Sequence, residues 1–142
     1  MGIRQKLNGK RAYFDSNVFI YLMEGFVSFE ASLHEIREAI LNREVQVFTS
    51  ELTLCEVLVA PFRDEKAELV LMYKNFIEES GAFQLLPTTK ETYFRASLIH
   101  AKSRLKTADA IHVATAMNAV CNVFVTNDKA IKLPHGIERI EL

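Results

Sequence analysis

Four acidic side chains stand out because their places along the chain allow them to meet. They are Asp15, Glu56, Asp109 and Asp128. Asp15 and Asp128 lie at or just beyond the ends of two apolar runs, residues 11–15 and 123–125, which predict buried strands. Either aspartate could simply cap the helix that comes next, since Asp is a favoured N-cap residue. In an open parallel sheet, however, ligands bind outside the carboxyl ends of the strands, where both carboxylates are expected.

Glu56 belongs to a predicted helix, residues 51–60, that is apolar on nearly all sides and is therefore expected to be buried. An isolated buried charge costs several kcal/mol even after the structure relaxes. A metal ion, a cationic side chain or protonation should compensate this carboxylate. A salt bridge from the edge of the helix is the simpler alternative.

Asp109 falls in the first turn of a predicted helix, residues 107–120, which Thr107 is expected to cap. The helix dipole alone would stabilise a negative charge there by about 0.3–1 kcal/mol. Val113 and Ala116 share its helix face, so the side chain should point toward the end of the sheet rather than into water.

Acids gathered in one crevice repel one another, and their pKa values rise unless a cation offsets the repulsion. Mg²⁺ and Mn²⁺ prefer oxygen ligands, and the chain has no Cys or His at zinc-ligand spacing. Cys55 and Cys121 lie far apart in apolar segments and are expected to be buried free thiols. The residues therefore favour a Mg²⁺ or Mn²⁺ centre, with one or two ions.

The segments that would position these acids alternate between the hydrophobic period of a strand and that of a helix. Strands are expected at residues 11–15, 45–48, 83–86, 123–125 and 137–140. Helices are expected at residues 18–23, 29–41, 51–60, 64–79, 91–105, 107–120 and 129–131, with Pro61 discouraging continuation of the third. This alternation predicts an α/β fold around a mainly parallel sheet. With 142 residues, 49% of them hydrophobic and no linker, one domain over residues 1–142 is expected.

The formal net charge of −1 argues against a protein that grips long nucleic acid through many phosphates, so any such contact must be local. Arg104 and Lys106, together with Lys102, precede the Asp109 helix and could meet phosphates or be ordinary solvated charges. A second basic group lies between residues 4 and 11.

No run of about 18 apolar residues occurs, and Lys6 stands where a myristoylation motif needs Ser or Thr, so a cytoplasmic protein without a membrane span or lipid anchor is expected.

The segments that contain the four acids resemble the PIN-domain family, particularly the VapC-like toxins of toxin–antitoxin pairs. They are Tyr-Phe-Asp-Ser-Asn-Val at 13–18, residues 50–57 around Glu56, Leu-Lys-Thr-Ala-Asp-Ala-Ile-His at 105–112, and Val-Thr-Asn-Asp at 125–128. Their order and approximate spacing match together over nearly the whole chain, which is more specific than any one segment.

The resemblance implies a three-layer α/β/α sandwich, an acidic pocket for Mg²⁺ or Mn²⁺, and endonucleolytic hydrolysis of RNA. It implies that Asp15 and Asp109 are direct metal ligands and that Glu56 and Asp128 act partly through water. Four polar residues would orient ligands or substrate, or only cap helices: Asn17, Thr107, Thr126 and Asn127. His112, one helical turn after Asp109, could tune that acid or touch substrate, but a hydrogen-bonded core residue is the stronger expectation.

A toxin would also imply a cognate antitoxin that lies over the acidic pocket, with an Arg or Lys against the carboxylates. A homodimer is expected as well. The early apolar helices and a surface of Met72, Tyr73 and Phe76 are candidate contacts, although a core face explains the same pattern.

Other readings fit less well. A PIN ribonuclease of RNA processing and a catalytically silent PIN-like module that binds RNA or protein both remain open. A haloacid-dehalogenase-type fold expects a second Asp where this chain has Asn17. A receiver domain expects an acidic pair after the first strand and a phosphoacceptor Asp after a middle strand, and neither is visible.

Overall fold

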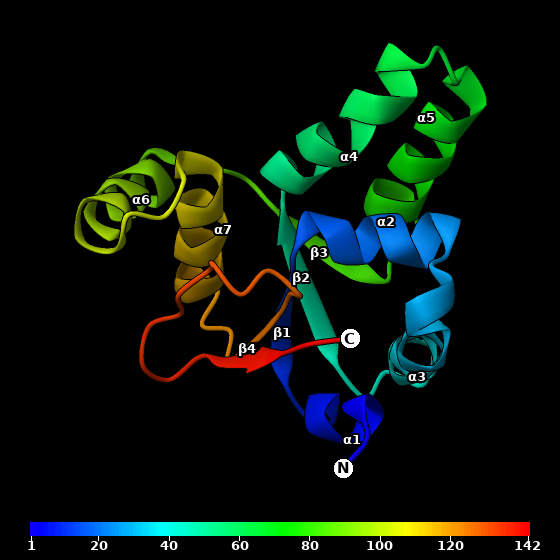
Figure 1. Ribbon diagram of the computed structural model, residues 1–142, viewed down its shortest axis with the longest axis horizontal. Coiled ribbons are helices and arrows are strands. Elements are labelled where there is room, and N and C mark those ends of the chain that lie inside the picture. The colour runs from blue at the N-terminus through cyan, green and yellow to red at the C-terminus, as the bar shows by residue number, and fades with distance from the viewer.

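The computed structural model describes all 142 residues, and its centre is a five-stranded sheet (Figure 1). The strands are β1 (Arg11–Phe14), β2 (Gln46–Ser50), β3 (Phe83–Leu86), β4 (Val123–Val125) and β5 (Glu138–Ile140). They are ordered β3-β2-β1-β4-β5, and every neighbouring pair is parallel. The chain thus moves one way from β1 to β3 and returns to the other side of β1 with β4. The topological switch point of the fold lies between β1 and β4.

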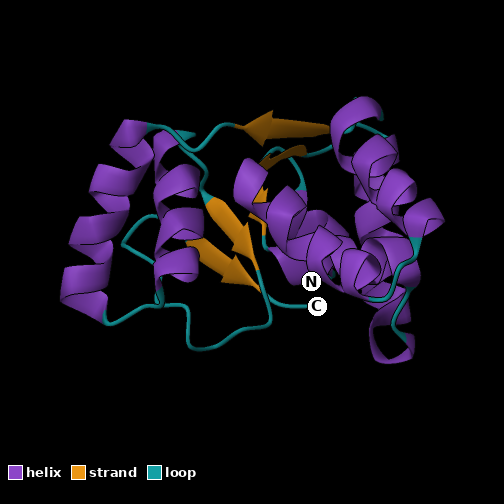
Figure 2. Cartoon of the chain, turned by 90° about the horizontal axis from the view of Figure 1, so that it is seen from above, coloured by secondary structure: helices purple, strands orange, loops and turns teal.

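Helices cover both faces of this sheet, as Figure 2 shows from above. The first half of the chain supplies α1 (Ile3–Leu7), α2 (Ser16–Glu24), the 3₁₀ turn Val27–Phe29, α3 (Glu30–Leu41) and α4 (Glu51–Arg63). The second half supplies α5 (Ala67–Lys74), the π turn Asn75–Glu79, α6 (Lys90–Ser103) and α7 (Thr107–Asn118). The α/β/α prediction is confirmed. None of these helices combines the length and apolarity needed to cross a membrane.

Alternate residues of each strand face opposite layers, which produces two cores. Ala12 and Phe14 of β1 pack with α1, α2 and α3, whereas Tyr13 between them packs with α6 and α7. In the second core the rings of Tyr13 and Phe124 stack with centroids 5.0 Å apart. Since Asp15 is two residues beyond Tyr13, the strand period directs the acid toward the same layer as α7.

Several predicted bounds needed correction. Helix α1 was not predicted, because only Ile3 and Leu7 of its five residues are buried. Residues 129–131 form a turn instead of a helix. Lys106, not Thr107, is the N-cap of α7, and no side chain caps it. Helix α4 continues past Pro61 to Arg63, although residue 61 has no N–H to donate to the helix.

The prediction that the helix around Glu56 is buried was wrong. Val59 and Phe62 of α4 are 56% and 63% exposed, and Val57 is among the few residues of that helix that are buried. Cys55 is exposed, contrary to prediction, whereas Cys121 is buried as predicted. Glu56 therefore lies on a helix that is half open to solvent, although its own carboxylate has protein partners.

Helix α7 ends in a Schellman motif. The N–H of Cys121 bonds the carbonyl of Ala116 at 2.9 Å, and the N–H of Val120 bonds the carbonyl of Met117 at 3.0 Å. This motif holds Val120 at φ 55°, in the left-handed region that disfavours a β-branched residue. Val120 is 73% exposed, so little packing offsets that strain.

We predict that Val120→Gly raises the free energy of unfolding by about 1 kcal/mol, because glycine adopts this conformation without steric cost. Ala119→Gly is the matched control. Ala119 has an ordinary φ of −83°, so the same change there should lower stability by about 0.5–1 kcal/mol. Urea denaturation of both variants measures the difference, and a loss of stability in both would contradict the strain at Val120.

Candidate active site

Asp15 lies at the switch point, between the ends of β1 and β4. It is the N-cap of α2, and its Oδ1 accepts a hydrogen bond from the N–H of Ser16 at 2.8 Å. Its Oδ2 accepts one from the hydroxyl of Thr126, the residue after β4, at 2.7 Å. The Thr126 hydroxyl in turn accepts from the N–H of Asp128 at 3.0 Å. Asp15 is only 7% exposed, and these bonds fix its carboxylate and connect it to the chain at Asp128.

Glu56 reaches the same edge of the sheet from α4. Its Oε1 accepts a hydrogen bond from the hydroxyl of Ser16 at 2.6 Å and lies 2.5 Å from Nε2 of His112 on α7. Burial by itself raises the pKa of Glu56, but the hydrogen bonds from His112 and Ser16 and the charge of His112 outweigh it and hold that pKa below its ordinary value. The partner that the sequence required for this carboxylate is therefore a histidine and a serine of the protein itself.

Buried hydrogen bonds connect Glu56 through His112 to Tyr13 of β1. His112 is 1% exposed, and its Nδ1 lies 2.6 Å from the hydroxyl of Tyr13. An ionised carboxylate can only accept, so Nε2 of His112 donates to Glu56. The other ring nitrogen, Nδ1, shares its hydrogen bond with the Tyr13 hydroxyl, so His112 links Tyr13 to Glu56. Burial raises the pKa of Tyr13, although the hydroxyls of Ser50, Thr53 and Thr49 counteract it in part, so Tyr13 keeps its proton for this bond. The prediction of a hydrogen-bonded core histidine is confirmed.

Asp109 is the acid without a hydrogen-bond partner. It lies half-buried in the first turn of α7. Burial raises its pKa most, and the charges of Asp128, Asp15 and Glu56 raise it further, while His112 acts in the opposite direction. The three other acids are therefore near enough to repel Asp109, which is the electrostatic signature expected of an acidic cluster.

The donor set suits a hard divalent cation. All four candidate ligands are carboxylates, and no cysteine belongs to the group. No three His, Cys, Asp or Glu side chains already converge as metal ligands. Several of their oxygens already accept hydrogen bonds: both of Asp15, Oε1 of Glu56, and Oδ1 of Asp128, which accepts from the N–H of Ala130 at 2.9 Å. Each such oxygen retains a second lone pair, and a cation would relieve the repulsion at Asp109.

The other predicted site residues have different surroundings. Asn127 accepts a hydrogen bond from the N–H of Leu142 at 2.7 Å, so its amide is directed to the C-terminal segment. Asn17 and Thr107 are exposed, as are Arg104 and Lys106 in the connection between α6 and α7. Of the four residues expected to orient ligands, Thr126 alone bonds one of the acids.

Sequence reasoning missed Ser16 and Tyr13 as members of the site. Ser16 bonds both Asp15 and Glu56, and its only signal in the sequence is that it follows Asp15. Tyr13 had a clearer signal, because residues two apart on a strand share a face. The contact between Glu56 and His112 joins residues 56 positions apart and has no local signal.

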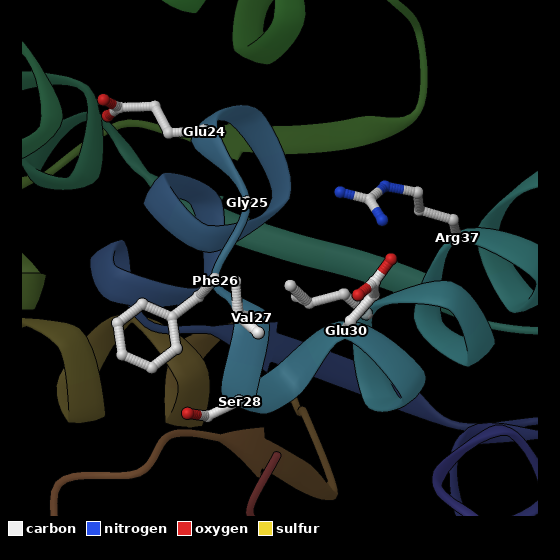
Figure 3. Close-up of a pocket in the computed structure, with 8 residues that line it drawn as sticks. Glu24, Gly25, Phe26, Val27, Ser28, Glu30 and Arg37 are labelled. Carbon is white, nitrogen blue, oxygen red and sulfur yellow. The ribbon is translucent and has the colours of Figure 1, made fainter.

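Large hollows of the surface lie away from the acidic cluster. One of about 660 Å³ is formed by residues 24–28 with Glu30, Leu33 and Arg37. Figure 3 shows Glu30 and Arg37 on its α3 side and the ring of Phe26 pointing away from them. None of the four acids lines this hollow.

The protein is thus an α/β protein with a parallel sheet and carboxylates at the switch point of that sheet. Residues 12–134 match the PIN domain family, and the chain belongs to that family. PIN domains are typically nucleases and usually depend on metal ions. No curated protein matches the chain in sequence.

Solved structures of toxin–antitoxin complexes share the fold. A toxin–antitoxin complex from Klebsiella pneumoniae is 25% identical, with a TM-score of 0.61 over 89% of this chain and 94% of that chain. VapBC2 from Rickettsia felis bound to a promoter DNA fragment is 13% identical, with a TM-score of 0.69 over 92% and 98%. DNA-bound VapBC from Salmonella typhimurium is 17% identical, with a TM-score of 0.66 over 93% and 98%. The resemblance to VapC toxins inferred from the sequence is confirmed.

We predict that Tyr13→Phe lowers the free energy of unfolding by about 1–3 kcal/mol, because it leaves Nδ1 of the buried His112 without its hydrogen-bond partner. Tyr93→Phe is the matched control. The Tyr93 hydroxyl bonds Thr88 at the surface, and its removal should change stability by less than about 0.5 kcal/mol. Equal effects in urea denaturation would show that the Tyr13–His112 bond contributes nothing.

The pKa values of Asp109 and Glu56 are shifted in opposite directions. Neutralising each residue by mutation should therefore change the stability of the metal-free protein, measured in EDTA, in opposite directions. The pKa of Asp109 is raised, so its ionisation costs stability above that pKa and costs nothing below the ordinary value of 3.8. Asp109→Asn should therefore stabilise the protein at neutral pH, with a gain that disappears in acid.

The pKa of Glu56 is lowered, so its ionised form adds stability above the ordinary value of 4.5, and this is lost as the pH falls through the lowered pKa. Glu56→Gln should therefore destabilise the protein at neutral pH, and the difference should shrink in acid. Urea denaturation across this pH range measures both variants. The same sign for both would contradict the electrostatic description of the site.

Proposed function

We propose that the protein is a metal-dependent endoribonuclease that hydrolyses RNA phosphodiester bonds, and that it is the toxin of a VapBC-type toxin–antitoxin pair. The observation that carries the proposal is the gathering of the acids at one end of the sheet, where Ser16 bonds both Asp15 and Glu56 and Thr126 links Asp15 to the chain at Asp128. Membership of the PIN family and the shared fold with toxin–antitoxin complexes support it. The proposal takes residues 1–142 as one PIN-like domain.

Asp15 and Asp109 are proposed to hold Mg²⁺ or Mn²⁺ directly, and Glu56 and Asp128 through water. When bound, the ion polarises a phosphoryl oxygen and lowers the pKa of a water molecule. Ser16 and Thr126 keep the carboxylate of Asp15 in place, and His112 does the same for Glu56. These bonds hold the acids in one orientation before RNA arrives, so less ordering is needed when it binds.

Exposed basic residues at the start of α7 are proposed to position the RNA. Arg104 and Lys106 stand in the three-residue connection that leads into α7, and neither makes an ion pair. Asp109 follows within one turn. A phosphate held by these side chains would therefore lie beside the acids.

An antitoxin is the proposed regulatory partner. The relatives in solved structures come from toxin–antitoxin complexes, two of them with DNA. An antitoxin Arg or Lys placed against the carboxylates would neutralise the repulsion at Asp109 in the way a metal ion would. It would thereby compete with the ion.

A homodimer is also proposed, but the surface expected for it needs correction. Tyr73 is fully buried and its hydroxyl bonds Glu24, and Phe76 packs against the core, so of that trio Met72 alone is substantially exposed. The exposed large apolar side chains of these two helices are Val59 and Phe62 of α4 and Leu71 and Met72 of α5. Light scattering on a size-exclusion column should give twice the 16.2 kDa chain mass. A monomer at every concentration would contradict the dimer.

The test of the nuclease is cleavage of structured and single-stranded RNAs with Mn²⁺, Mg²⁺ or EDTA. We predict cutting with either ion and none in EDTA. Asp15→Asn and Asp109→Asn should each reduce the rate at least about 100-fold, because each removes a ligand charge. Asp64→Asn, which changes an exposed Asp at the end of α4, is the matched control and should cut at the parent rate. Equal activity in all four proteins would refute the assigned centre.

A further inference from the structure

The near-zero net charge conceals a strong asymmetry. From residue 87 to residue 137 seven of the ten charged side chains are Lys or Arg, and two of the three acids are Asp109 and Asp128. The rest of the chain has ten basic and fifteen acidic side chains. The basic stretch comprises α6, α7 and the connection to β5, and Figure 1 shows α6 and α7 together on one side of the sheet. One side of the protein is therefore positively charged.

A groove of about 830 Å³ lies on this basic side, between α6, the end of α7 and Pro134. Phe94, Leu98, Ile99 and Met117 give it an apolar lining. Phe94 is 70% exposed, which is unusual for a large aromatic side chain. The groove thus presents an aromatic face that no part of the chain covers.

Three cations edge the groove: Lys90, Arg95 and Lys102. None of them takes part in an ion pair, since every ion pair of the structure involves Arg4, Arg63 or His112. Glu91 is the single acid among the lining residues. The lining therefore combines a net positive charge with the exposed ring of Phe94.

Helix α6 connects the groove to the start of α7, where Asp109 lies. Helices α6 and α7 are joined by three residues and pack as antiparallel neighbours, with Asn118 near Thr92 at the end far from Asp109. Lys102 is consequently at the other end, and Arg104 and Lys106 continue the positive charge to the first turn of α7. With 14 residues, α6 extends about 20 Å along this path.

Single-stranded RNA fits this combination, because bases stack on exposed aromatic rings while phosphates contact lysines and arginines. A second copy of the chain fits less well. In a two-fold interface the same patch meets itself, which would place the uncompensated cations of two grooves against each other.

We propose that the groove of Lys90, Phe94, Arg95, Leu98 and Lys102 binds the single-stranded flank of the RNA and leads it toward Asp109. The inference rests on the proposed ribonuclease function and adds to it a second contact region, about one helix length from the acids. Lys90 and Lys102 contact phosphates, and Phe94 stacks on a base.

The experiment is binding of a fluorescein-labelled, single-stranded decanucleotide RNA, followed by anisotropy in EDTA at several salt concentrations. Lys90→Ala/Lys102→Ala should bind more weakly and lower the slope of log affinity against log salt by about 1.4, because each phosphate contact contributes about 0.7. Phe94→Ala should weaken binding at least about five-fold and leave the slope unchanged. Lys66→Ala/Lys74→Ala removes two exposed lysines from α5 and its N-cap and should change nothing.

Equal slopes for both double variants would overturn the proposal. A fall in molecular mass on light scattering caused by Phe94→Ala would also overturn it, by identifying the groove as an interface between copies. Binding in EDTA does not require cleavage, so the two proposals fail separately. If the groove variants weaken RNA binding but no RNA is cut with Mn²⁺, the nuclease proposal is wrong and the groove proposal stands. If RNA is cut with Mn²⁺ but the groove variants bind it normally, the groove proposal is wrong and the nuclease proposal stands.

Discussion

The pairing of β1 with β4 is the constraint on which the rest of the site depends. It brings Asp15 and Thr126 together although they are 111 residues apart, and the hydroxyl of Thr126 then fixes the Asp15 carboxylate. Ser16 extends this arrangement to Glu56, and α7 adds Asp109 and His112. Four separate segments therefore contribute one acid each to a single edge of the sheet. Without the pairing of β1 with β4, Asp15 and the segment that carries Asp128 would not lie side by side.

The hydrogen bonds distribute the electrostatic cost of the cluster unevenly. Asp15 and Glu56 have donors that stabilise their charges, whereas Asp109 has none and is opposed by its neighbours. The site therefore combines carboxylates that accept several hydrogen bonds with one, Asp109, whose ionisation is less favourable than that of an ordinary Asp. Perturbed carboxylates of this kind are concentrated at functional sites, because binding and catalysis require them.

The sequence predicted most of the fold, because the elements differ clearly in period. The strand at residues 83–86 was predicted at its observed bounds, and β4 likewise. Helix α1 has too few residues for a periodic signal. The exposure of Val59, Phe62 and Cys55 was missed, because an apolar sequence does not reveal whether another element covers it.

The candidate acids were chosen from their positions at strand and helix ends, and in the structure the charges of Asp128, Asp15 and Glu56 raise the pKa of Asp109. The contacts that hold them could not be predicted, because Ser16, Glu56 and His112 meet only through the tertiary structure. Tyr13 was within reach of prediction from the alternation along β1. The local sequence pattern thus indicates which acids lie at the same end of the sheet. Their hydrogen-bond partners depend on long-range packing.

The central claim is that the unfavourable charge at Asp109 exists to hold a divalent cation. Equilibrium urea denaturation with and without Mn²⁺ tests it most directly, for the parent protein and Asp109→Asn. Mn²⁺ at about 100 times its dissociation constant should stabilise the parent by about 2.7 kcal/mol, and Asp109→Asn should lose most of that gain. If Mn²⁺ stabilises both proteins equally, or neither, Asp109 is not part of a metal centre and the account is wrong.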